Sequence, residues 1–306
     1  MFQDCETDSL GELADNCDLS RLGIDPADVA DASLIHEGAG SRVYRIVTAR
    51  GSLILKWFTE CAQANEVHCY ALLQRHSVPT LATRGWTDDA ILLEDLESSL
   101  RWRLATAADV ESPGVGVAVA EWYRALHAAG RRVLASPKER PAFLQREADA
   151  LTPAVVLETG RKLGLAAGPI WRLAAASIEA LGDAMRALPE TLNYNDFHWS
   201  NLALSRQQGQ PLQAIVYDYH LLGIGPAYSD CRNVTSALSG RAATAFMEAY
   251  GPLDEQEALL DAPVSVLFAL SVAVQRPQLP AWSAALLRSI ENGQLERDLR
   301  RALEAL

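Results

Sequence analysis

No stretch of this sequence stays apolar for the roughly 18–20 residues that a membrane-spanning helix needs. The longest apolar run, Val264–Val274, is shorter and is interrupted by serines, so we expect no contact with a membrane. The N-terminus is acidic and lacks the basic and then apolar layout of a signal peptide. The cysteines lack metal-ligand spacing, which favours reduced thiols in a cytoplasmic protein. They are Cys5, Cys17, Cys61, Cys69 and Cys231.

Positive charge is scarce as well. The chain has 27 Lys and Arg against 39 Asp and Glu, a formal net charge of −12, which argues against a nucleic-acid-binding protein. Residues 1–31 hold nine acidic residues and one arginine, so they contribute −8 and leave −4 for the rest of the chain. We therefore expect an acidic, solvated and partly helical N-terminal segment, and we infer no acidic pocket from the net charge.

Three polar residues beyond position 190 have the spacing of a phosphotransfer site. Asn201 follows Asp196 by five positions, and Asp218 comes directly after an apolar stretch, Ala214–Tyr217. In kinases, one carboxylate of such a loop receives the proton of the acceptor hydroxyl, while an amide and a second carboxylate hold Mg²⁺. A lone Asp and Asn at this spacing is common by chance, but the second aspartate makes chance a weaker explanation. Asp196 is therefore the candidate proton acceptor, and Asn201 and Asp218 are candidate Mg²⁺ ligands.

A glycine-containing turn in the first third could hold nucleotide phosphates. Gly38, Gly40 and Ser41 lie between apolar stretches, and glycine lets backbone N–H groups approach phosphate oxygens. An ordinary hairpin turn has the same composition. Further on, the apolar stretch that ends at Glu94 and Leu96 precedes a change to helical periodicity. We expect the adenine ring to contact the backbone there.

A lysine in an apolar strand is the next candidate. Lys56 lies within Ser52–Phe58, and a buried lysine requires an anionic partner. It could instead reach water from an edge strand. Glu66 on the following helix, Ala62–Gln74, is the expected partner and would direct the Lys56 ammonium toward the nucleotide phosphates. Lys56 and Glu66 therefore join the candidate nucleotide-binding residues.

Taken together, these residues resemble the aminoglycoside phosphotransferase and choline kinase family. Tyr194–Asn201 is similar to the family's catalytic loop, His-x-Asp-x-x-x-x-Asn, and Val216–Tyr219 resembles its Ile-Asp-Trp or Ile-Asp-Phe segment. Three further segments resemble its Gly-x-Pro-x-x-Asp continuation, its Leu-His helix end and its inter-lobe hinge: Gly225–Asp230, Arg124–His127 and Ile91–Leu96. The resemblance runs from about residue 34 to 235, and residues 240–306 carry no motif.

The resemblance implies an α+β, protein-kinase-like fold with two lobes. Residues 32–96 would form a small antiparallel sheet with one helix, and residues 97–306 a larger, mostly helical lobe with the catalytic loop and the acceptor pocket. Clear helical periodicity over Ala118–Ala129 and Ile170–Leu188 agrees with this. The implied activity is transfer of the γ-phosphoryl group of ATP, with Mg²⁺, to a hydroxyl of a small molecule such as an aminoglycoside, choline or a sugar-like alcohol. The acceptor, the choice between ATP and GTP as donor, and the oligomeric state stay open.

Two other functions compete with this one. The first is a catalytically weak or inactive relative that binds nucleotide or a partner, which Tyr194 favours because the family usually has histidine there. Retention of all four candidate polar residues argues against it: Lys56, Asp196, Asn201 and Asp218. The second is a protein kinase, which is disfavoured because Tyr219 and His220 follow Asp218 where protein kinases have Phe-Gly. We interpret His198 as a hydrogen-bonded loop residue and Asp230 as a structural residue that ties the loop to a helix.

Overall fold

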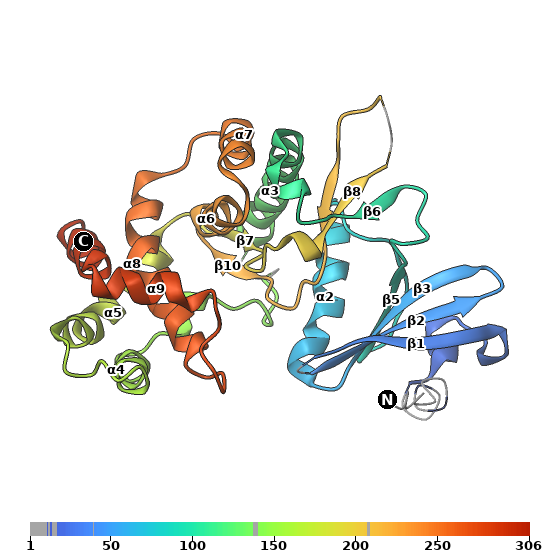
Figure 1. Ribbon diagram of the computed structural model, residues 1–306, viewed down its shortest axis with the longest axis horizontal. Coiled ribbons are helices and arrows are strands. Elements are labelled where there is room, and N and C mark those ends of the chain that lie inside the picture. Colours follow the sequence, from blue (N-terminus) through green and yellow to red (C-terminus); the bar gives the residue numbers. More distant parts are fainter. Residues whose placement is uncertain (1–10, 12, 14–16, 39, 137–139, 207–208) are drawn as a thin grey trace, which may run out of the picture. The chain divides into compact units, whose positions relative to one another are not determined.

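The computed structural model describes the chain except residues 1–10, 12, 14–16, 39, 137–139 and 207–208 (Figure 1). Its contacts divide the chain into two compact units, each built from three separate segments. The first unit comprises Met1–Ala125, Asp196–Leu221 and Ala237–Tyr250. The second comprises Leu126–Asn195, Leu222–Ser236 and Gly251–Leu306. An antiparallel sheet at the N-terminus and a mostly helical remainder confirm the expected α+β fold.

A five-stranded antiparallel sheet dominates the first unit (Figure 1). In spatial order its strands are β1 (Val29–Gly38), β2 (Ser41–Thr48), β3 (Gly51–Phe58), β5 (Ala90–Glu94) and β4 (Thr83–Trp86). The tight turn between β1 and β2 contains Gly40 at φ +83°, a conformation that side-chain-bearing residues rarely adopt. Helix α2 (Cys61–Arg75) contacts β3 and β5, and it buries Val67, Tyr70 and Leu73.

The N-terminal segment is only partly solvated over its described residues, because it also contributes apolar side chains to the core of the first unit. Its apolar side chains pack against the sheet in one hydrophobic core: Leu13, Cys17, Leu19, Leu22 and Ile24. Its aspartates at positions 18, 25 and 28 remain exposed. The net charge obscured an amphipathic pattern, because a segment can keep its carboxylates in water while it buries the apolar residues between them.

A second, three-stranded antiparallel sheet completes the first unit. Its strands are β6 (Trp102–Leu104), β8 (Leu202–Ser205) and β9 (Ala214–Val216), with β8 in the middle. The pairing of Trp102 with Ser205 joins segments that lie about a hundred residues apart in the sequence. This sheet fixes the ends of two loops, one that enters β8 after Asp196 and one that leaves β9 before Asp218. Helix α7 (Gly240–Tyr250) also belongs to this unit.

The second unit is mainly helical. Its helices are α4 (Pro153–Lys162), α5 (Pro169–Ala187), α6 (Ala227–Ala237), α8 (Glu255–Ala273), α9 (Ser283–Glu291) and α10 (Gln294–Glu304). Helices α5, α8 and α10 share one hydrophobic core, to which Leu181, Leu267 and Leu299 contribute. A short antiparallel pair, β7 (Thr191–Asn193) with β10 (Gly223–Gly225), completes the unit. Helix α3 (Pro113–Leu134) supplies residues to both units and continues past His127, where the resemblance suggested a helix end.

Helix α8 is long and apolar enough, by length and composition alone, to cross a membrane. Its packing gives it a different role, because Leu260, Leu267 and Leu270 are buried in the core of the second unit. It also carries two buried carboxylates, Glu257 and Asp261, which accept hydrogen bonds from α6. We therefore interpret α8 as a core helix.

Candidate active site

The lysine of β3 and the glutamate of α2 form an ion pair inside the first unit. Lys56 Nζ lies 2.6 Å from Glu66 Oε2, and the Glu66 side chain is only 1% exposed. The contact exists because α2 packs on β3, whose inward-facing residues include Lys56. Glu66 Oε1 is buried and finds no hydrogen-bond partner among the described residues. The pair holds the Lys56 ammonium in a fixed position among buried apolar side chains.

Asp218 joins this pair from the loop after β9. Its Oδ1 accepts hydrogen bonds from Lys56 Nζ at 2.7 Å and from His220 Nδ1 at 2.7 Å. Burial works to raise the pKa of Asp218, but the hydrogen bond from His220 and the charge of Lys56 outweigh it and hold that pKa well below its usual range. Asp218 is therefore an anion at neutral pH, and its second oxygen, Oδ2, has no partner in the described part of the chain.

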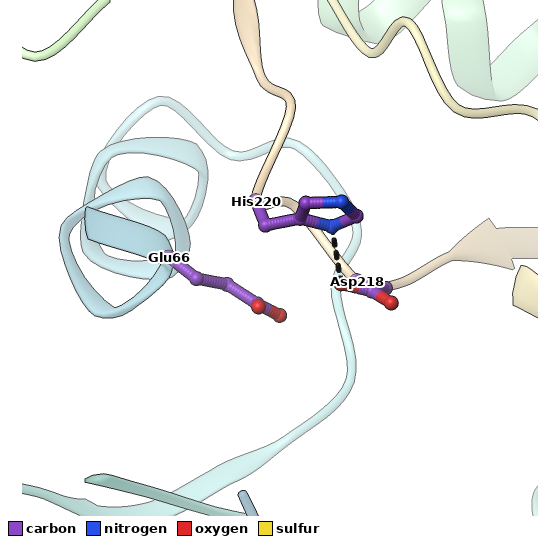
Figure 2. A group of neighbouring side chains, drawn as sticks. All are labelled: Glu66, Asp218 and His220. Carbon is purple, nitrogen blue, oxygen red and sulfur yellow. Dashed lines mark hydrogen bonds and ion pairs between the residues drawn. The ribbon is translucent and has the colours of Figure 1, made fainter. Parts of the chain in front are cut away.

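His220 was missed by the sequence reasoning. Figure 2 shows Glu66 directed from its helix toward Asp218, with the His220 ring above the Asp218 carboxylate and bonded to it. Ligand atoms of these three residues lie within 4.8 Å of one another, as in a metal site. The Lys56 ammonium, however, already bonds both carboxylates and would repel a cation held between them. A histidine two positions after the candidate metal ligand Asp218 was the available signal.

The candidate catalytic loop places Asp196 and Asn201 in direct contact. Asn201 Nδ2 donates to Asp196 Oδ2 at 2.9 Å and to the Asp196 carbonyl oxygen at 3.3 Å. This bond orients the amide so that Oδ1 faces away from Asp196, and Ser200 Oγ is near it at 3.4 Å. Burial raises the pKa of Asp196, His220 opposes this effect, and the charge of Asp218 adds a smaller increase. A carboxylate with a raised pKa is suited to accept a proton.

Two side-chain oxygen atoms of the site are suitable ligands for Mg²⁺, which prefers carboxylate and amide oxygens. These are Asn201 Oδ1 and Asp218 Oδ2, neither of which is held by a strong bond within the described residues. Two residues beside these loops have left-handed backbones although they are not glycine: Asn195 at φ 66° and Asp218 at φ 68°. Such strain is often stored at functional sites.

In the second unit, Asp230 anchors the backbone that leads into the catalytic loop. Its carboxylate accepts hydrogen bonds from the N–H groups of Tyr194 and Asn195, and it lies 3.0 Å from Nε2 of the buried His127. Asp230 is therefore structural, as the sequence suggested. Tyr194 is fully buried, so the residue that replaces the family's histidine serves the packing beneath the loop.

A cavity in the first unit has the size and lining for a nucleotide base. It leaves ≈ 230 Å³ for water-sized groups and brings together Lys56, Glu66 and Asp218 with the candidate contacts Glu94 and Leu96. Apolar residues supply most of its surface, among them Ile35, Val43, Ile54, Leu81 and Leu93. The Leu96 N–H donates to no acceptor among the described residues, so it is available to a ligand.

Residues that the sequence did not single out hold the segment at Leu96 in place. Asp95 is 4% exposed and accepts from Ser52 Oγ at 2.5 Å, Arg45 Nε at 2.9 Å and the Glu97 N–H at 3.0 Å. These bonds tie the segment to β2 and β3. They order the backbone before any ligand arrives, which lowers the entropic cost of binding.

The glycine turn lies away from the lining of this cavity. Gly38 ends β1, Ser41 begins β2, and the Gly40 carbonyl accepts from the N–H groups of Thr59 and Glu60. The turn thus contacts the start of α2 through Gly40, and the contact of Gly38, Gly40 and Ser41 with phosphates stays a prediction.

A phosphotransferase enzyme family model matches residues 31–260. Solved structures with the same fold include a choline/ethanolamine kinase family protein from Mesorhizobium loti, 14% identical with a TM-score of 0.61, covering 96% of this chain and 99% of that one. The streptomycin–ATP–APH(2")-IIa ternary complex is 11% identical, with a TM-score of 0.59 and coverage of 98% and 99%. An ethanolamine kinase from Plasmodium vivax is 12% identical, with a TM-score of 0.57 and coverage of 100% and 96%. No curated protein sequence gives a significant match.

Proposed function

The chain belongs to the phosphotransferase enzyme family, and we propose that it transfers the γ-phosphoryl group of ATP to a hydroxyl of a small molecule. The observation that carries this proposal is the Lys56 ammonium, which bonds both Glu66 and Asp218 beside a cavity of nucleotide size. A buried cation between two carboxylates costs desolvation, which makes the arrangement hard to explain as packing alone. A phosphate-binding lysine explains it.

Each candidate residue takes one role in this reaction. Lys56 would neutralise phosphate charge, and Asn201 and Asp218 would supply oxygen ligands to Mg²⁺, which when bound offsets the negative charge of the phosphates. Asp196 would orient the acceptor hydroxyl and accept its proton. The hydroxyl oxygen forms a bond to the γ-phosphorus while the bond from that phosphorus to the bridging oxygen of ADP breaks. Glu94 and Leu96 would bind the base through the backbone.

Support for ATP as donor comes from two of the structural neighbours, which were solved with ATP or ADP bound. The acceptors named for the neighbours are choline, ethanolamine and antibiotics, so the acceptor proposed here is a small hydroxyl compound of that kind. The net charge of −12 argues against a nucleic-acid substrate. We also propose a cytoplasmic location.

The test is acceptor-dependent release of ADP from ATP and Mg²⁺ across a panel of amino alcohols, aminoglycosides and sugar alcohols. We expect one class to give turnover, and we expect Asp218→Ala to lower it by at least ~10³-fold because a metal ligand is lost. Asp88→Ala, an exposed aspartate of the same unit, is the matched control and should leave turnover unchanged.

Two results would contradict the proposed function. ATP binding without acceptor-dependent ADP release would identify the weak or inactive relative, which Tyr194 favours. Normal turnover in Asp218→Ala would show that the site has been misassigned.

A further inference from the structure

A second cavity of the first unit has no part in the proposed reaction. Its walls come from the turn η1 (Leu19–Leu22), the turn that joins β2 to β3, the strands β4 and β5, and the loop after β5. It leaves ≈ 770 Å³ for water-sized groups, a size comparable to small-molecule binding sites. Part of its wall is apolar and buried, since Leu22 and Leu92 are each 2% exposed. We call it the arginine groove, after three residues that line it: Arg50, Arg84 and Arg101.

The guanidinium groups of these three arginines lack a close carboxylate partner. Arg84 makes no hydrogen bond or ion pair within the described part of the chain. The Arg101 guanidinium lies over the Trp102 ring, 4.8 Å from its centroid, and pairs with no described carboxylate. Arg50 Nη2 lies 3.9 Å from Asp28 Oδ2, which is longer than a hydrogen bond, and both side chains are largely exposed. The groove therefore presents N–H donors that the protein itself does not use.

Other arginines of the first unit are paired, which makes the groove unusual. The chain has 39 acidic residues against 27 basic ones, so carboxylate partners are plentiful. Three arginines of this unit bond a carboxylate within 3 Å: Arg42 with Glu37 at 2.8 Å, Arg45 with Asp95 at 2.9 Å and Arg103 with Asp109 at 2.6 Å. Free guanidinium groups around one concave surface contrast with this pattern.

Two carboxylates in the lining of the groove already have hydrogen-bond donors of their own. Asp95 accepts from Arg45, Ser52 and the Glu97 N–H, as described above. Glu94 Oε1 accepts from Ser99 Oγ at 2.5 Å. A guanidinium presents N–H donors in a planar fork that matches the two oxygens of a phosphate or carboxylate. The arginines of the groove are therefore suited to anionic groups supplied by a ligand.

The groove and the candidate nucleotide cavity share one segment of chain. Glu94 and Asp95 line both of them. Ser52, which lines the groove, and Arg45, which lines the nucleotide cavity, donate to the same carboxylate of Asp95. A ligand in the groove would thus contact the segment whose backbone at Leu96 is the candidate contact of the base.

We propose that the arginine groove is a regulatory site for a small organic polyanion, one with at least two phosphate or carboxylate groups. Three guanidinium groups call for more than one anionic group, and the buried leucines favour an organic scaffold between those groups. Occupancy restrains the segment Glu94–Leu96 before the base arrives, so that the base then binds at a lower entropic cost. The anion site stands apart from the proposed phosphotransferase function, and only its coupling to the base rests on that function.

The first test is calorimetric titration of the full chain without nucleotide or Mg²⁺. The probes are fructose bisphosphate and citrate, with acetate at equal ionic strength as the monovalent reference. We expect at least one probe to bind ~10-fold or more tightly than acetate, and the tighter of the two identifies phosphate or carboxylate as the preferred group.

Variants of one arginine show where the probe binds. Arg84→Gln should weaken binding at least ~10-fold because charge-assisted bonds are lost, and Arg84→Lys should weaken it less because the charge remains. Arg75→Gln is the matched control, an exposed and unpaired arginine of α2 outside the groove, and should bind as wild type does. Lys56→Met should also retain binding, because Lys56 does not line the groove.

The second test measures the coupling with adenosine, which has no phosphate and needs no Mg²⁺. A saturating amount of the better probe should tighten adenosine binding by ~5-fold or more in wild type. Arg84→Gln should show no such change at the same probe concentration. Because coupling is reciprocal, adenosine should tighten binding of the probe by the same factor.

Three results would overturn the proposal. They are no preference for either polyanion over acetate, full binding in Arg84→Gln, and loss of binding in Lys56→Met, which would place the anion in the nucleotide cavity. Independent binding of probe and adenosine would overturn the regulatory role. Failure of adenosine to bind at all would count against the proposed nucleotide site, while the first titration would still decide the anion site.

Discussion

Asp218 adopts a backbone conformation that few residues tolerate, and its chemistry explains why aspartate is suited to it. Aspartate and asparagine are enriched among non-glycine residues at positive φ, and Asp218 and Asn195 both have such values. The loop after β9 thereby directs Asp218 Oδ1 to Lys56 and His220. An apolar stretch followed by aspartate predicts a metal ligand from sequence alone, but only the structure shows that Lys56 and His220 hold the Oδ1 atom of Asp218.

The role of Asp196 leads to a prediction about the chemical step. Asp196→Asn keeps the shape of the side chain but removes the proton acceptor, so we expect turnover to fall by about 10²–10⁴-fold. ATP affinity should stay near the wild-type value, because Asp196 does not line the candidate nucleotide cavity. Steady-state kinetics and nucleotide titration separate the two effects. Asp88→Asn is the matched control, and joint loss of ATP binding and fold in Asp196→Asn would make Asp196 a structural residue.

Helix α3 packs closely against β7 because Gly130 has no side chain. A Cβ on Gly130 would lie 2.1 Å from the Leu192 nitrogen and 2.3 Å from Thr191 Oγ1, so the helix approaches β7 as closely as a backbone can. Thr191 Oγ1 also donates to the His127 carbonyl oxygen at 2.8 Å. These contacts hold the strand that precedes the catalytic loop, and they explain why residue 130 is a glycine.

Gly130→Ala should therefore destabilise the protein although alanine favours helices. The collision with β7 should cost about 1–3 kcal/mol, more than the ~1 kcal/mol that helix propensity returns. Gly114→Ala in the first turn of the same helix meets nothing closer than 3.7 Å and should be neutral or slightly stabilising. Urea unfolding of both variants measures the difference. Equal stability of the two would mean that β7 shifts freely.

For the chain as a whole, the sequence predicted the fold class and the grouping of Lys56, Glu66 and Asp218, but it did not predict how the short strands around them pair. Lys56, Glu66 and Asp218 each stand in a local pattern, so their order along the chain sufficed to group them. The three-residue strands β6 and β9 are too short for periodicity, and their pairing with β8 depends on tertiary contacts. The boundary between lobes at residues 96 and 97 stays a prediction.

The environment of Glu147 could not be predicted for the same reason. Two elements distant in the sequence act on it: α6 with Asp230 and Arg232, and α8 with Asp261. Nothing within a few residues of Glu147 distinguishes it from a solvated glutamate. Its properties therefore arise from the packing of the second unit.

That packing makes a prediction about stability and pH. The pKa of Glu147 rises from 4.5 to about 7 on folding, mainly through burial. Between those values the folded chain holds a proton that the unfolded chain has released, so stability falls as pH rises through this window. A glutamine at position 147 is neutral at every pH, so Glu147→Gln does not lose stability in this way. Relative to wild type, the variant should gain about 1–3 kcal/mol of unfolding free energy between pH 5 and pH 8.

Urea unfolding at both pH values measures this gain. Glu179→Gln is the control, because an exposed glutamate has little to gain from neutralisation. The measurement at pH 5 is the internal control. The wild-type carboxyl is mostly neutral there, so wild type and Glu147→Gln should be nearly equal in stability. A gain of the same size at pH 5 would attribute the effect to packing. No gain at pH 8 would mean that the folded chain solvates Glu147 well.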